Sequence, residues 1–132
     1  MKLKGRFVIE AMGIPDLLVK TLNGIADSIK KTYTVSAMEV GNPEKTGDKF
    51  HTSFLEITVE FKNIQSMVEF MMNYTPTFVE VLEPYKMELT AGELEEIANS
   101  FMTKLHDYDK SLKSVAGVNK LLTRKLQERN TK

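Results

Sequence analysis

A seam of mostly apolar residues at alternating spacings of four and three constrains this 132-residue chain more than any other feature. It runs for more than four repeats of seven residues and consists of Leu94, Ala98, Phe101, Leu105, Tyr108, Leu112, Val115, Asn119, Leu122 and Leu126. Such a seam is typical of a helix that joins a coiled coil. A helix over residues 91–129 would be about 58 Å long, roughly twice the diameter of a small domain. Its second half is therefore predicted to overhang, to fold back near Gly117, or to pack on another copy of the chain.

Self-association is the prediction that we favour for the second half of this helix. The predicted oligomer interface consists of Leu112, Val115, Asn119, Leu122 and Leu126. A single asparagine in such a seam can set the register and the number of partners. A helix that covers a sheet also shows spacings of three and four, so residues 91–109 are predicted to pack on the preceding domain.

The first 89 residues predict an α+β domain. Alternating apolar and polar residues indicate strands, and apolar residues three and four apart indicate helices. The strands are expected at 2–11, 33–40, 50–61 and 77–83, and the helices at 15–31 and 64–74. This order is that of the ferredoxin-like fold, so we predict a four-stranded antiparallel sheet with two helices on one face. Residues 41–49 are predicted to form a polar loop, and residues 90–132 a long C-terminal helix whose first half packs on this domain.

The net charge of zero conceals an uneven distribution of charge. Residues 110–132 carry a net charge of +6, and the preceding 109 residues carry −6. A basic tail of this kind can contact nucleic acid, a membrane surface, or the acidic part of another chain. Within the sheet, outward-facing Arg6 and its basic neighbours are predicted to lie opposite Glu56 and Glu60.

No residue pattern in the chain indicates catalysis, a cofactor or a metal centre. Cysteine is absent, and His51 and His106 are far apart in the sequence. Nucleophile and phosphate-loop motifs are also missing. We therefore predict a protein without catalytic residues, metal or cofactor. The basic N-terminus lacks the apolar stretch of an export signal, which predicts a cytoplasmic, membrane-free location.

Sequence-specific RNA binding is not favoured, although some RNA-binding domains share this order of elements. Their third strand carries glycines, basic residues and stacking aromatics. The third predicted strand here lacks the glycines and flanking basic residues, and Glu56 and Glu60 would repel phosphate.

The segment that joins the first strand to the first helix resembles the start of ACT-type regulatory domains. The residues that carry the resemblance are Gly13, Pro15, Asp16, Leu17 and Leu18. In those domains the corresponding turn binds amino acids or other small effectors, usually at a dimer interface. The resemblance implies an anionic small-molecule site at Gly13, Ile14, Pro15 and Asp16, where helix N–H groups would face the ligand. The glycine that usually follows the proline in that family is replaced by Asp16.

Two functions are therefore predicted from the sequence. The first is a non-enzymatic, homo-oligomeric domain, such as a homodimer, that regulates a partner or binds a small molecule. The alternative is an interaction module whose basic C-terminal helix contacts a different protein or, without sequence specificity, nucleic acid.

Overall fold

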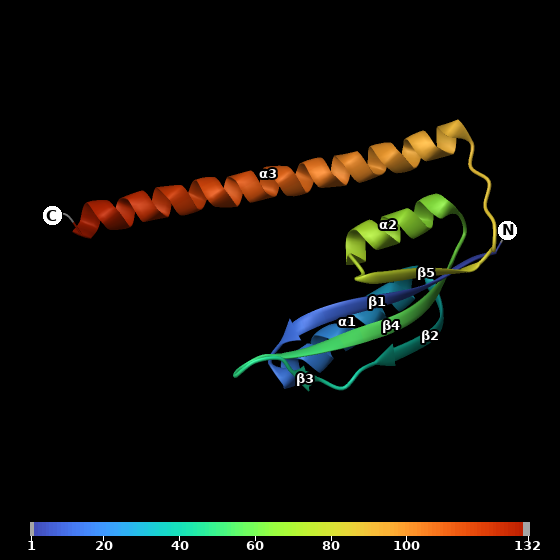
Figure 1. Cartoon of the computed structure of the whole chain (residues 1–132), viewed down its shortest axis with the longest axis horizontal. Coiled ribbons are helices and arrows are strands. Elements are labelled where there is room, and N and C mark those ends of the chain that lie inside the picture. The colour runs from blue at the N-terminus through green and yellow to red at the C-terminus, as the bar shows by residue number, and fades with distance from the viewer. Residues whose placement is uncertain (1, 131–132) are drawn as a thin grey trace. The chain divides into compact units, whose positions relative to one another are not determined.

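A computed structural model describes residues 2–130 of the chain (Figure 1). The elements are β1 (Leu3–Gly13), α1 (Pro15–Thr32), β2 (Thr34–Val40), β3 (Glu44–Lys45), β4 (His51–Phe61), α2 (Ile64–Tyr74), β5 (Phe78–Glu83) and α3 (Ala91–Asn130). The predicted α+β class, the antiparallel sheet and the long C-terminal helix are confirmed. The chain divides into two compact units; the first ends at Thr90 and the second begins at Ala91.

The sheet of the first unit is antiparallel throughout, and its long strands follow the order β2-β4-β1-β5. The first strand lies between β4 and β5, as the predicted order of elements requires. Strands β1 and β4 pair without interruption from Leu3 opposite Phe61 to Gly13 opposite His51. Strand β5 is an edge strand, which suits the proline that follows it.

Strand β3 corrects the prediction that residues 41–49 form only a loop. Glu44 pairs with Thr52 and Lys45 pairs with His51, so β3 adds a short strand beside β4, and the sheet within residues 2–130 has five strands instead of the predicted four. The turn is closed by the Thr46 amide, which donates to the Phe50 carbonyl oxygen at 3.0 Å. The pairing depends on backbone hydrogen bonds. Because the side chains of this segment are polar and do not alternate with apolar ones, the sequence pattern did not predict a strand here.

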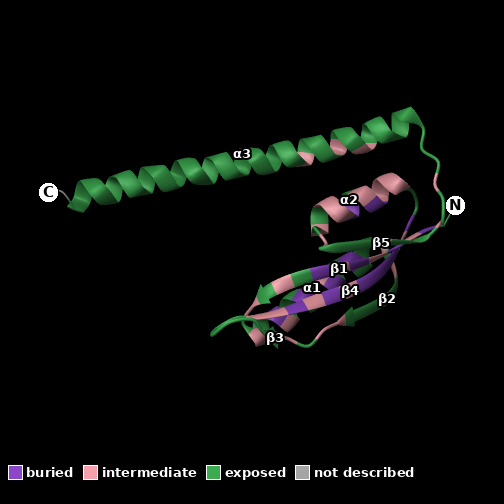
Figure 2. Ribbon diagram, viewed as in Figure 1, coloured by how far each residue is buried: buried purple, intermediate pink, exposed green. Residues whose placement is uncertain are grey.

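The core lies between the sheet and helices α1 and α2, as the buried positions in Figure 2 indicate. Alternate residues of β1 and β4 point into it, and α1 and α2 add apolar side chains from one face each. At its centre the Phe7 ring lies 4.6 Å from that of Phe70 and 5.8 Å from that of Phe61. Aromatic rings at these separations stabilise one another beyond the burial of their area.

The opposite face of the sheet carries ion pairs across the strands, as predicted. The two guanidinium nitrogens of Arg6 lie 2.8 Å from Glu56 Oε1 and 3.0 Å from Glu80 Oε2. The hydrogen bonds to Glu80 and Glu56 raise the pKa of Arg6 above its ordinary value. Lys2 Nζ lies 3.3 Å from Glu60 Oε1. These contacts join β1 to both of its neighbouring strands.

Helix α2 begins and ends where local sequence signals place it. The side chain of Asn63, the residue before the helix, accepts a hydrogen bond from the Ser66 amide at 2.9 Å. Thr75 follows the helix with a φ of 44°, in the left-handed region that ends many helices. Pro76 then prevents the helix from continuing.

Helix α3 contains 40 residues and continues through Gly117. At about 1.5 Å per residue it is roughly 60 Å long. The prediction that the chain folds back near Gly117 is therefore wrong, because α3 is a single helix through this residue. No helix within residues 2–130 is both long enough and apolar enough to cross a membrane.

Candidate functional site

Helix α3 carries the longest apolar stripe of the described chain. Taken by itself, the helix has no buried residue. The apolar seam side chains range from Leu105, with 43% of its surface exposed, to Leu112, with 71% exposed. Met102 and Val118 flank the seam and are also more than half exposed. The stripe therefore offers an exposed, mostly apolar surface from Leu94 to Leu126, with Asn119 as its polar member. Packing of residues 91–109 on the first unit stays a prediction.

The predicted ligand loop is an open turn at the end of β1. Gly13 is the last residue of the strand, and Pro15 is the first residue of α1. Ile14 has an extended backbone, provides no side-chain cap, and is 55% exposed. Apart from Gly13 itself and its two chain neighbours, no atom of the described residues lies within 4 Å of the position that a Cβ on Gly13 would occupy. The first-turn amides of α1 are thus left without a side-chain cap, in a setting that suits an anion.

His51 is a residue of this region that the sequence analysis did not connect with the loop. It lies directly opposite Gly13 in the β1–β4 pairing. Strand alternation puts it on the same face as Ser53 and Leu55, the face that the helices cover. Its Nδ1 atom is buried and has no hydrogen-bond partner among residues 2–130. The strand register was the missing information, because residues 13 and 51 are far apart in the chain.

Asp16 lies in the first turn of α1 and has two opposite effects. Its negative charge favours the positive end of the helix dipole. The same charge would oppose an anionic ligand at that end. A ligand at this turn must therefore gain more from the amides and from His51 than it loses to Asp16.

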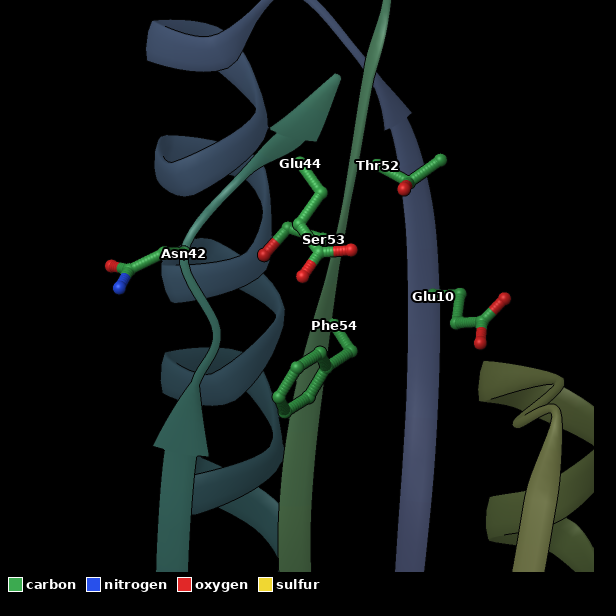
Figure 3. A pocket seen from close by; sticks show the side chains of 6 residues that line it. All are labelled: Glu10, Asn42, Glu44, Thr52, Ser53 and Phe54. Atoms are coloured by element: carbon green, nitrogen blue, oxygen red, sulfur yellow. The ribbon is translucent and has the colours of Figure 1, made fainter. Parts of the chain in front are cut away.

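A shallow hollow of about 210 Å³ lies elsewhere on the sheet, near β3 (Figure 3). Its lining consists of Glu10, Asn42, Glu44, Thr52, Ser53 and Phe54. Two of these residues are acidic and none is basic, so the hollow does not suit an anion. The hydroxyl of Ser53 is already engaged, because it donates to the Gly41 carbonyl oxygen at 2.6 Å. The predicted ligand loop contributes no residue to this hollow.

The titratable side chains of residues 2–130 do not indicate a metal site. Within residues 2–130, no three His, Asp or Glu side chains are placed to hold a metal ion. Burial, with a contribution from Tyr74 and Glu69, raises the pKa of Tyr33 above its ordinary value. Tyr33 packs against Phe61 and Phe70 in the core, which gives it a structural role.

Comparison with known proteins places the chain in a family. Residues 4–130 match the MJ0538 family. A relative from Methanocaldococcus jannaschii, titled "Uncharacterized protein MJ0538", is 27% identical over 84 residues, which cover 62% of this chain and 32% of that protein. The aligned part thus spans about a third of the relative's length. No solved structure matches the chain significantly. Because the match to the family extends over almost all of its residues, the chain belongs to the MJ0538 family.

Proposed function

We propose that this chain is a non-enzymatic, homo-oligomeric regulatory domain in which α3 joins the copies and the α+β unit carries the binding surface. The observation that carries the proposal is the exposed seam of α3, whose alternating spacing of four and three is unbroken from Leu94 to Leu126 and includes one polar residue, Asn119. Burying one leucine side chain contributes roughly 1.5–3 kcal/mol. A second helix along the seam would bury many such side chains, and that gain is what supports self-association.

The test is a single charge placed within the seam. Leu112→Glu should convert the assembly to monomers, because a carboxylate would be buried between apolar side chains. Ser114→Glu is the matched control: it adds the same charge two residues away, outside the seam, and should leave the assembly intact. Native mass spectrometry and sedimentation velocity report the mass in each case. A wild-type protein that stays at 15.0 kDa at high concentration would contradict the proposal.

That outcome would favour the alternative function, in which the basic half of α3 contacts a different protein or nucleic acid. Binding to nucleic acid through lysine and arginine weakens steeply as salt increases. A salt-dependent gel shift with the wild-type monomer would support this alternative.

A second candidate function is the binding of a small anionic ligand at the Gly13–Asp16 turn. The observation that favours it is the buried Nδ1 of His51, which has no hydrogen-bond partner among residues 2–130, in the strand residue opposite Gly13, two positions before the uncapped α1. The resemblance to ACT-type domains points to the same turn, although a shared fold does not establish a shared function. Carboxylates and phosphates are the groups that helix N–H donors and an imidazole recognise.

Titration with inorganic phosphate, followed by NMR, tests this second candidate. The amide signals of Asp16 and Leu17 should shift, and His51→Gln should weaken the response. His106→Gln is the control, because His106 is an exposed residue of α3. If phosphate and glutamate both leave the Asp16 and Leu17 signals in place, the turn is not an anion site.

A further inference from the structure

We propose that two copies of α3 pair in an antiparallel orientation, about a two-fold axis that passes Lys110. The inference rests on the proposed self-association and adds the orientation of the two chains and the residues that meet. The occupant of the exposed seam is thus a second copy of this helix.

The seam itself is symmetric about Lys110. In an antiparallel pair centred there, residues equally distant from Lys110 face each other. Every seam position then meets a seam position of the second copy: 94 meets 126, 98 meets 122, 101 meets 119, 105 meets 115, and 108 meets 112. A shift of one repeat in either direction would leave unmatched seam residues at the ends. The centred register therefore buries the most apolar surface.

The charges of α3 favour this orientation. Residues 91–109 contain five acidic side chains and one basic, whereas residues 110–130 contain six basic and one acidic. An antiparallel pair places the acidic half of each copy against the basic half of the other. Glu95 and Glu96 then lie level with Lys125 and Arg124 of the second copy, and because Glu96 and Arg124 point away from the seam, the attraction acts between the two halves as a whole and not through direct ion pairs. A parallel pair would align like charges along both halves, which opposes association.

Helix dipoles and side-chain size point the same way. Parallel helices place their like poles together, and antiparallel helices place opposite poles together. A parallel pair in register would also stack Phe101 on Phe101 and Ala98 on Ala98. The antiparallel pair instead sets Ala98 against Leu122, and Phe101 against the smaller Asn119. Large side chains then oppose smaller ones, which fills the interface more evenly.

Asn119 is the seam residue that favours the parallel orientation, because in a parallel pair its side chain would lie opposite Asn119 of the second copy and could form a hydrogen bond with it. This single polar residue is outweighed by the charges, because a parallel pair would place like charges together along both halves of the helix.

The antiparallel orientation also determines where the α+β units lie, since each unit is joined to α3 at Ala91. The two Ala91 residues would lie at opposite ends of the paired helices, so the two units would be attached far from each other.

Disulfide trapping distinguishes the orientations. The chain has no cysteine, so introduced thiols are its only ones. In an antiparallel pair, Ala98→Cys alone and Leu122→Cys alone leave no thiols opposite each other. The double variant A98C/L122C places a thiol opposite a thiol twice in each dimer. We expect mild oxidation to shift the double variant from 15.0 kDa to a covalent dimer, and both single variants to stay uncrosslinked.

The matched control is the double variant T103C/G117C, which lies at equivalent distances from Lys110 but on the helix face away from the seam. It should stay uncrosslinked, and crosslinking equal to that of A98C/L122C would overturn the inference. Crosslinking of Ala98→Cys alone would show a parallel dimer, which overturns the orientation and leaves self-association standing. A wild-type monomer in sedimentation velocity would overturn both.

Discussion

At the scale of single residues, two glycines that look alike in the sequence have opposite environments. Gly24 lies within α1, and apart from its chain neighbours and the backbone of its own helix, no atom of the described residues lies within 4 Å of a Cβ placed there. Gly5 lies in β1, and a Cβ there would come within 2.7 Å of the Phe7 ring. Only the second glycine is required by its surroundings.

Substitution of these glycines by alanine should therefore change stability in opposite directions. Gly24→Ala should stabilise the protein by about 0.5–1 kcal/mol, because alanine loses less backbone entropy in a helix. Gly5→Ala should destabilise it by about 1–3 kcal/mol, because the buried Phe7 ring would have to move. Urea denaturation measures both free energies of unfolding. A destabilised Gly24→Ala variant would show a contact that the structure lacks.

Tyr33 leads to a prediction about stability at high pH. Its pKa is raised above 10.0 in the folded protein, mainly by burial, so the phenol ionises first in the unfolded chain. Above pH 10.0 the unfolded state then binds fewer protons, and stability falls as the pH rises through the interval up to the folded pKa. Tyr33→Phe keeps the ring contacts and removes the proton, so its melting temperature should fall less steeply above that pH. Tyr85→Phe, at a 96% exposed position, is the control. Parallel curves for wild type and Tyr33→Phe would refute this account.

At the scale of elements, the helix starts and the seam of α3 follow from local signals, but its partner does not. Asn63 caps α2 by accepting a hydrogen bond from a residue three positions away, so neighbouring residues are sufficient to specify where this helix starts. The spacing of the seam residues indicates only which face of the helix is apolar. Whether that face meets its own unit, a second copy or another protein depends on surfaces elsewhere.

The proposed antiparallel pairing makes a prediction about charge reversal in α3. The variant E95K/E96K should weaken the dimer at low salt and much less at high salt, because Glu96 and Arg124 point away from the seam and the charges act across a distance that salt screens. The further exchange R124E/K125E on the same chain should reverse that loss, since unlike charges would again lie level with each other. Sedimentation equilibrium at low salt measures both constants. In a parallel dimer E95K/E96K would exchange one repulsion for another and leave Kd almost unchanged.

At the scale of the whole molecule, the core is confined to the first compact unit. All of its buried residues come from β1, α1, β4 and α2, and Met87 packs against them from beyond β5. Among the described residues 91–130 of the second unit, none belongs to this cluster. The α+β unit should therefore be able to fold without α3.

A fragment that ends at Thr90 should unfold cooperatively at a temperature close to that of the full chain, and it should be monomeric. A fragment that ends at Pro84 lacks Met87 and should melt at a lower temperature, because apolar surface of the core becomes exposed. Circular dichroism measures the melting, and sedimentation velocity measures the mass. A self-associating Thr90 fragment would move the assembly surface to the α+β unit.

The candidate sites could be predicted only in part. The turn at Gly13 to Asp16 was located from a proline and an apolar helix pattern, and the structure places it where a strand ends and a helix starts. Its role as a ligand site stays a prediction. His51 could not be added from the sequence, because its position opposite Gly13 depends on the register of two distant strands.

The sequence by itself determined the helices and the long strands, the α+β class and the apolar seam of α3, because the periodicity of side chains is local information. The tertiary structure alone decided the β3 pairing, the contacts of Arg6 with both Glu56 and Glu80, and the place of His51. These features depend on backbone hydrogen bonds and on register between segments far apart in the chain. No local pattern contains that information, because the same alternation of side chains is compatible with several registers.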